Sequence, residues 1–230
     1  MLEVRGLNAW YGESHILHGM DFDVGEGEVV TLLGRNGAGK TTTLKSIMGM
    51  VGRRAGSVPF KGKQTIDLAS DRIARLGIAF CPEERGIFAS LDVEENLLLP
   101  PQVAPGGLTL GQVFELFPNL RERLASQGTK LSGGEQQMLA IGRILRTGAR
   151  LLLLDEPTEG LAPVIVQQIG RTLAKLKEQG FTILLVEQNF KFAQTVADRH
   201  YIVEHGRVVD VVAGGQLEAN LARMHEYLGV

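Results

Sequence analysis

The sequence lacks most of the features that define disulfide-rich, membrane-spanning and nucleic-acid-binding proteins. Cys81 is the only cysteine in 230 residues, so no disulfide can form within the chain, as expected for a reducing compartment. No apolar run approaches the roughly 18 residues of a membrane span, and the amino terminus has no basic segment followed by an apolar one. Lys and Arg number 24 against 26 Asp and Glu, a balance that predicts no nucleic-acid partner. Any role at a membrane is therefore expected to come through a partner protein.

Short apolar runs alternate with helical patterns along the chain, which is typical of an α/β protein. The runs at 2–4, 20–24 and 57–61 predict antiparallel strands that flank a first parallel strand at 29–33. Further parallel strands, buried on both faces, are predicted at 77–81, 151–155, 182–187 and 200–204. Helical patterns separated by prolines interrupt this rhythm and predict an inserted helical subdomain at about 84–146, within a single domain spanning 1–230.

A glycine-rich loop directly follows the apolar run 29–33. Its residues are Gly34, Arg35, Asn36, Gly37, Ala38, Gly39, Lys40 and Thr41, which match G-x-x-x-x-G-K-[ST] between a strand and a helix start. In such a loop the backbone N–H groups converge on a phosphate, Lys40 reaches the β- and γ-oxygens, and the Thr41 hydroxyl is placed to hold Mg²⁺. A glycine turn with a chance lysine is the alternative. The pattern predicts that the chain binds ATP or GTP.

A second segment has the chemistry of a helix amino terminus. Ser132 is a natural helix cap and is followed by Gly133, Gly134 and Glu135 at the start of a pattern with helical spacing. Paired glycines there present bare N–H groups, which favour an anion. The alternative is a capped helix on the surface with no ligand.

A third segment ends the apolar run 151–154 with two adjacent carboxylates, Asp155 and Glu156. In α/β sheets, ligands bind at the carboxyl ends of the strands. Asp155 is therefore expected to face the metal, and Glu156 to polarise a water molecule. Two solvated acids at the start of a loop are the alternative.

In this order, the three segments resemble the ATP-binding cassette family along essentially the whole chain. Residues 131–136 read LSGGEQ, the family's signature without a change. Tyr11 falls where the family places an aromatic ring against adenine, although a buried core tyrosine is the competing interpretation. The resemblance implies an α/β fold with a P-loop NTPase (RecA-like) core, an antiparallel β subdomain and an inserted helical subdomain. It also implies ATP and Mg²⁺ as ligands.

The resemblance further implies a dimer that encloses two ATP molecules. Each site would combine residues Gly34 to Thr42 of one protomer with residues Ser132 to Glu135 of the other. Lys40, Mg²⁺ and the facing helix terminus would stabilise charge on the γ-phosphoryl group, while Glu156 orients and deprotonates the attacking water. A lone protomer is then expected to bind nucleotide and to hydrolyse it poorly.

Finer likeness narrows the resemblance to the ATPase subunits of branched-chain amino acid importers. The stretches that carry it are 82–88, 134–143, 160–163, 185–189 and Tyr227-Leu228-Gly229. Within the first of these, Glu84 and Gly86 depart from the subgroup pattern. Two positions differ from the wider family. Most members have glutamine where this chain has Glu83, and histidine where it has Gln188. Glu83 could coordinate Mg²⁺ or be a solvated loop acid. Gln188 can donate an amide N–H to the γ-phosphate without becoming cationic, or it can cap the end of a strand.

The importer reading implies a set of partners. These are a second cassette ATPase, as homodimer or heterodimer, two integral-membrane permease subunits and, indirectly, an extracytoplasmic solute-binding protein. The chain would then lie peripherally on the cytoplasmic face of the inner membrane. The alternatives are a cassette ATPase with no transport role, or an importer subunit for urea or short amides, because the solute is chosen by the other subunits.

Overall fold

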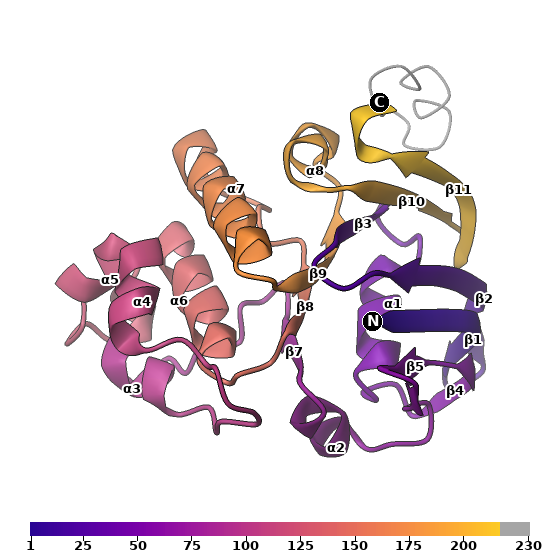
Figure 1. Cartoon of the computed structure of the whole chain (residues 1–230), viewed down its shortest axis with the longest axis horizontal. Helices are drawn as coiled ribbons and strands as arrows, with labels where there is room; N and C mark the ends of the chain where they lie inside the picture. The colour runs from indigo at the N-terminus through magenta and orange to yellow at the C-terminus, as the bar shows by residue number, and fades with distance from the viewer. Residues whose placement is uncertain (217–230) are drawn as a thin grey trace.

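The computed structural model describes residues 1–216 and contains two β-sheets, with helices packed between and beside them (Figure 1). The central sheet has the strand order β11-β10-β3-β9-β8-β7 and is parallel from β10 to β7, with β11 antiparallel at its edge. Its strands are β3 (Val29–Leu33), β7 (Ile78–Cys81), β8 (Leu151–Asp155), β9 (Thr182–Glu187), β10 (Arg199–Glu204) and β11 (Arg207–Ala213). The carboxyl ends of the parallel strands therefore meet at one edge.

The second sheet is antiparallel, with the order β2-β1-β5-β6 and with β4 also paired to β1. Its strands are β1 (Leu2–Tyr11), β2 (Ser14–Val24), β4 (Arg53–Ser57), β5 (Pro59–Phe60) and β6 (Lys63–Gln64). In β1, buried residues alternate with exposed or partly buried ones over much of the strand, so one face of this sheet packs on the core.

The central strands are apolar throughout because each of their faces packs on a different cluster. Leu151, Leu153 and Leu184 belong to the cluster that the central sheet forms with the antiparallel sheet and α1 (Lys40–Ile47). Leu152 and Leu185 face the opposite cluster, which includes residues of α6 (Gly133–Leu145) and α7 (Pro163–Glu178). This confirms the prediction of strands buried on both faces.

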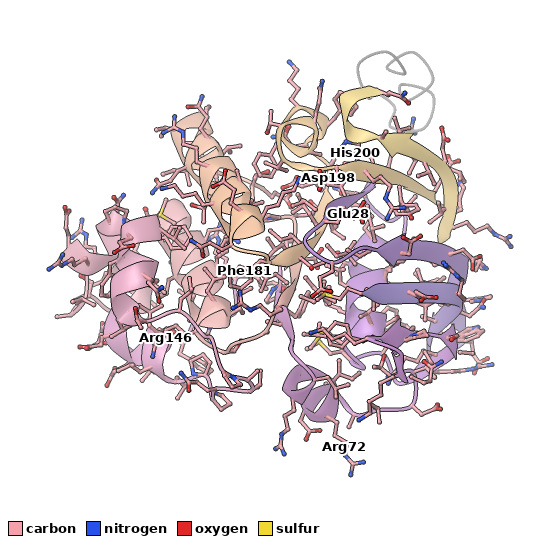
Figure 2. All side chains as sticks on the ribbon, in the orientation of Figure 1. Glu28, Arg72, Arg146, Phe181, Asp198 and His200 are labelled. Carbon is pink, nitrogen blue, oxygen red and sulfur yellow. The ribbon has the colours of Figure 1, made fainter. Side chains whose placement is uncertain are left out.

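Short helices fill the region between β7 and β8 and lie together on one side of the central sheet (Figure 1). They are α3 (Val93–Leu98), α4 (Leu110–Leu116), α5 (Pro118–Glu122), the 3₁₀ turn η1 (Gly128–Lys130) and α6. Arg146, just after α6, donates to the carbonyl oxygens of Leu97 and Leu108 and so ties this group together (Figure 2). The remaining helices are α2 (Ser70–Arg75), α8 (Phe190–Val196) and the 3₁₀ turn η2 (Gly214–Gln216). The division of the chain into one domain with an inserted subdomain stays a prediction.

The structure confirms the α/β fold class and corrects several strand predictions. The runs 2–4 and 20–24 belong to much longer strands that pair with each other in a hairpin, in a sheet separate from β3. Polar side chains on the solvent face hid the rest of β1 and β2 from a search for apolar runs. The run 57–61 spans the end of β4 and the whole of β5, because Pro59 has no N–H to continue the ladder.

The sequence reasoning also missed β11, α5 and β6. Within residues 1–216, no helix is long and apolar enough to cross a membrane. The stretch Tyr227-Leu228-Gly229, which contributed to the resemblance, lies outside the described residues.

Candidate functional site

The glycine-rich loop connects β3 to α1, as its pattern predicts. A Cβ on Gly34 would lie 2.3 Å from the carbonyl oxygen of Val203, so no larger residue fits this close approach. Gly39 has a φ of 104°, in the left-handed region that favours glycine, and α1 begins at the next residue. Arg35, Asn36 and Gly37 are exposed at the tip of the loop, whereas Ala38 is buried.

Lys40 is buried inside this loop, with 4% of the residue exposed. Its ammonium Nζ donates to the carbonyl oxygens of Gly34 at 2.9 Å and Arg35 at 3.1 Å. The same ammonium lies 3.2 Å from Oε1 of Glu156. The loop therefore holds a positive charge at its centre, which is what a phosphate-binding loop requires.

Thr41 and Asp155 meet at the edge of the sheet where a metal is expected. The Thr41 hydroxyl donates to Oδ1 of Asp155 at 2.9 Å. Oδ2 of Asp155 is buried and has no hydrogen-bond partner among the described residues. Burial, helped by the negative charges of Glu156 and Glu83, raises the pKa of Asp155 to about 6, although the hydrogen bond from Thr41 acts to lower it. A buried oxygen without a partner beside a hydroxyl is a donor set that fits Mg²⁺.

Glu83 follows β7 by two residues and its side chain is exposed. Because β7 runs parallel to β8, Glu83 lies at the same edge of the sheet as Asp155, and its charge contributes to the raised pKa of that carboxyl. The structure thus brings Thr41, Asp155 and Glu83 to one edge of the sheet. Direct coordination by Glu83 stays a prediction.

Glu156 comes directly after β8 and has a backbone conformation that is rare outside glycine, with a φ of 44°. Its N–H donates to the carbonyl oxygen of Val186 in β9 at 2.9 Å, which fixes this turn against the neighbouring strand. Backbone strain of this kind is concentrated at functional sites. The turn directs the carboxylate of Glu156 to Lys40, so the candidate general base and the candidate phosphate ligand lie side by side.

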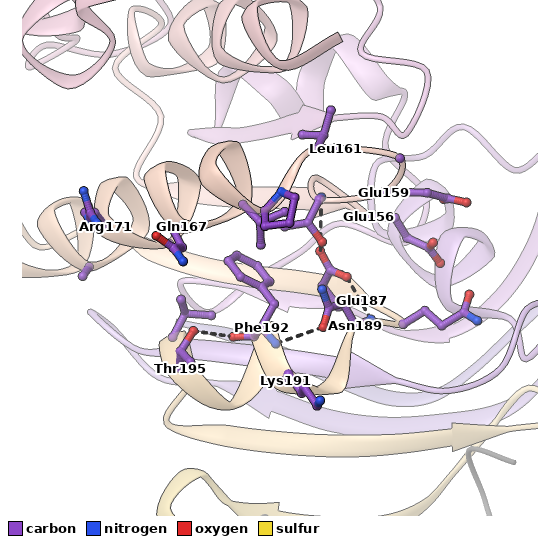
Figure 3. A pocket seen from close by; sticks show the side chains of 18 residues that line it. Glu156, Glu159, Leu161, Gln167, Arg171, Glu187, Asn189, Lys191, Phe192 and Thr195 are labelled. Carbon is purple, nitrogen blue, oxygen red and sulfur yellow. Dashed lines mark hydrogen bonds between the residues drawn. The ribbon is translucent and has the colours of Figure 1, made fainter. Parts of the chain in front are cut away.

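Glu156 also lines a pocket of about 1090 Å³ that continues between α7 and α8 (Figure 3). Gln188, the first residue after β9, is exposed and lines the same pocket, so the structure brings it to the Glu156 side of the site. In Figure 3, Glu156 and Glu159 lie at one end of the pocket and Arg171 at the other.

Tyr11 is the last residue of β1 and 48% of it is exposed, so the alternative of a buried core tyrosine is wrong. The hairpin that carries Tyr11 reaches the glycine-rich loop, since a Cβ on Gly39 would lie 2.9 Å from a methyl carbon of Leu17 in β2. An exposed ring on this hairpin is available to stack on a base. Its contact with adenine stays a prediction.

The segment from Ser132 to Glu135 forms a capping box at the start of α6. The N–H of Glu135 donates to the Ser132 hydroxyl at 3.3 Å, and the N–H of Ser132 donates to the Glu135 carboxylate at 2.8 Å. Glu135 also pairs with Arg123 at 3.5 Å. In Figure 1, α6 and α1 lie on opposite sides of the central strands. Within one chain, the capped terminus and the glycine-rich loop are therefore separate.

Sequence reasoning missed one residue of this site. Glu187, the last residue of β9, is 2% exposed, and burial raises its pKa to about 7. It accepts hydrogen bonds from Thr158 and from the backbone of Asn189. The signal was the one used for Asp155, an acid that ends an apolar strand at the same edge of the sheet.

Comparison with known sequences gives a consistent result. The sequence profile of the ABC transporter family matches residues 17–159. The chain is 43% identical to the high-affinity branched-chain amino acid transport ATP-binding protein BraG of Pseudomonas aeruginosa, over the whole length of both chains. It is 38% identical to the probable branched-chain amino acid transport ATP-binding protein LivF of Archaeoglobus fulgidus, over 90% of each chain.

Comparison with solved structures agrees on the fold. A nucleotide-free ATP-binding cassette from an ABC transporter superposes with a TM-score of 0.85 at 22% identity, covering 100% of this chain and 98% of that one. The dimeric structure of MJ0796, a bacterial ABC transporter cassette, superposes with a TM-score of 0.78 at 26% identity, covering 93% and 98%.

Proposed function

The chain belongs to the ABC transporter family, and on that premise we propose that it is the ATP-hydrolysing subunit that powers import of branched-chain amino acids through a membrane transporter. ATP binding and hydrolysis are the activity of this family of ATPases. The single observation that carries the amino acid specificity is the 43% identity to BraG over the full length of both chains.

The proposed mechanism assigns a task to each part of the site. The N–H groups of residues 34–42 and the Lys40 ammonium bind the phosphates of ATP, and Tyr11 stacks on adenine. Thr41 and Asp155, with Glu83, hold Mg²⁺, which when bound neutralises charge on the phosphate oxygens. Glu156 accepts a proton from the attacking water, and Gln188 donates an N–H to the γ-phosphate.

A second protomer completes the site in this proposal. The capped terminus from Ser132 to Glu135 starts a helix that lies on the other side of the central strands from α1, which supports contact with nucleotide bound to another subunit. The relative MJ0796 is itself described as a dimer. The partner is either a second copy of this chain or a different cassette ATPase.

We infer that two membrane permease subunits dock beside the helical region, and through them an extracytoplasmic solute-binding protein. Three large apolar side chains are exposed there: Phe88 by 44%, Leu98 by 52% and Leu99 by 51%. Apolar groups at the surface mark interaction sites when they gather in one region. The chain then lies peripherally on the cytoplasmic face of the inner membrane.

Reconstitution tests this function directly. The subunits that co-purify with the chain from detergent-solubilised membranes are placed in vesicles with the solute-binding protein, and ATP hydrolysis is measured with leucine, urea and acetamide in turn. Stimulation by leucine supports the proposal. Stimulation by urea or acetamide alone would show that the transported solute is not a branched-chain amino acid. Recovery of the chain with ribosomes or DNA and with no membrane protein would overturn the transport role.

A further inference from the structure

Glu187 binds two separate loops with its two carboxylate oxygens. Oε1 accepts hydrogen bonds from the Thr158 hydroxyl at 2.8 Å and from the Thr158 N–H at 3.3 Å. Oε2 accepts one from the N–H of Asn189 at 3.2 Å. Dashed lines in Figure 3 mark hydrogen bonds around Glu187 and Asn189, and Asn189 in turn accepts from the N–H of Phe192 to cap α8.

Both loops carry residues of the hydrolysis site. Thr158 lies two residues after Glu156, in the loop that follows β8, and Asn189 comes directly after Gln188. Glu187 itself ends β9, which is hydrogen-bonded to β8 and β3 on either side. Glu187 is therefore anchored at the end of a central strand, and its side chain limits the freedom of the two loops that meet there.

From this arrangement we propose that Glu187 is a positioning residue for ATP hydrolysis. By holding Thr158 with one oxygen and the backbone of Asn189 with the other, it sets Glu156 and Gln188 in fixed places around the γ-phosphate. The proposal rests on the ATPase function and adds a residue that acts through its neighbours, with no contact to the nucleotide.

The chemistry of a carboxylate explains why this residue type is present. Three donors converge on Glu187, and an ionised carboxylate is an acceptor on both oxygens. Glutamine has one acceptor oxygen, and its NH₂ would face another donor. Burying a carboxylate in this position is costly, as the raised pKa shows, and the negative charge of nearby Glu156 adds to that cost. The hydrogen bonds from both loops offset part of it.

The test uses isosteric variants of both members of the pair in the purified complex of the full-length chain. Glu187→Gln removes one acceptor, and Thr158→Val removes the hydroxyl donor while keeping the shape of the side chain. Thr172→Val is the matched control, because Thr172 is equally buried but donates within α7 to the carbonyl oxygen of Gln168 at 3.0 Å. The measurements are kcat and KM for ATP, with the melting temperature of each variant.

A positioning role predicts a selective fall in kcat. We expect kcat to fall about tenfold or more in Glu187→Gln and in Thr158→Val, with KM for ATP within about threefold of wild type, since misplaced groups slow the chemical step more than binding. Thr172→Val should keep wild-type kcat.

Two results would overturn the proposal: wild-type kcat in both single variants, or a loss of kcat matched by an equal rise in KM. If Glu187→Gln does not fold, Thr158→Val alone gives the test, and wild-type kcat in that variant would overturn the proposal. A wild-type complex without ATP turnover would overturn the proposed function and this role together. Normal wild-type turnover with unaffected variants would overturn the positioning role alone.

Discussion

The ammonium of Lys40 and the carboxylate of Glu156 form a buried ion pair with 3.2 Å between Nζ and Oε1. The cation assigned to the phosphates and the base assigned to the water are therefore bound to each other. In the proposed mechanism Lys40 contacts the phosphates of ATP, so its pairing with Glu156 is broken before Glu156 accepts a proton from water. This pairing shapes the first two predictions.

Replacing Lys40 with Ala is expected to abolish tight ATP binding, because the loop loses the cation at its centre. It also leaves Glu156 without its partner in a buried place, so the melting temperature should fall. Isothermal titration with ATP and a thermal melt measure the two effects. The double variant Lys40→Ala with Glu156→Gln should recover the melting temperature and still not bind. Tight ATP binding by Lys40→Ala would contradict the assignment of the phosphate loop.

Glu156→Gln is expected to bind ATP at least as tightly as wild type, since Lys40 is no longer held by a carboxylate. Its hydrolysis rate should fall about a hundredfold or more, the lower range for general-base catalysis. With the natural partner, ATP and Mg²⁺, size-exclusion chromatography should show a trapped dimer. A variant that stays monomeric under these conditions would contradict the shared site.

Removal of Mg²⁺ is expected to stop turnover, because the unpartnered Oδ2 of Asp155 and the Thr41 hydroxyl have no cation to hold. Phosphate release is measured in excess EDTA and again after Mg²⁺ is restored. Asp155→Asn should lose most of the response to added Mg²⁺. Full activity in EDTA would exclude a metal-dependent step.

Gln188→His is expected to add a titration to the pH dependence of kcat between about pH 5 and 8, because imidazole has a reference pKa of about 6.5 and an amide has none. Other acids of the site titrate in both proteins, so the comparison is between the two kcat profiles. Profiles that superimpose after scaling would place residue 188 away from the γ-phosphate.

A further pH effect concerns folding and comes from His200, which is fully buried in strand β10 of the central sheet (Figure 2). Its Nδ1 and the Thr31 hydroxyl are 2.6 Å apart, and burial lowers its pKa to about 4, with nearby Asp198 acting weakly in the opposite direction. Between about pH 6.5 and 4, the unfolded chain binds a proton at this ring and the folded chain does not. The free energy of unfolding should therefore fall as the pH drops through this window, by on the order of 3 kcal/mol at most.

The variant His200→Gln isolates this effect because it removes the titrating ring and keeps a group that can bond Thr31. Urea unfolding at several pH values should give a shallower loss of stability below pH 6.5 in the variant than in wild type. Asp155 and Glu187 titrate in both proteins and cancel in the comparison. Parallel curves would show that His200 is protonated at its ordinary pKa in the folded chain.

Local patterns were enough to predict those parts of the site whose chemistry is contiguous in the chain. The loop from Gly34 to Thr41 needs a strand, a turn and a helix start in succession, and the structure has them in those places. The helix cap predicted at Ser132 is likewise present, and the structure adds the reciprocal bond with Glu135, three residues on. The antiparallel strands were harder to predict, because their solvent-facing residues are polar and break the apolar runs.

The sequence by itself determined the family and the fold class and predicted the reacting groups, because each depends on short segments with their own chemistry. Only the tertiary structure decided which groups meet. The register of β3, β8 and β9 places Thr41 against Asp155 across 114 residues and Glu187 against Thr158 across 29. Hydrogen bonds and ion pairs act over about 3 Å, so partners this far apart in the chain are set by strand pairing and packing, which no local pattern records.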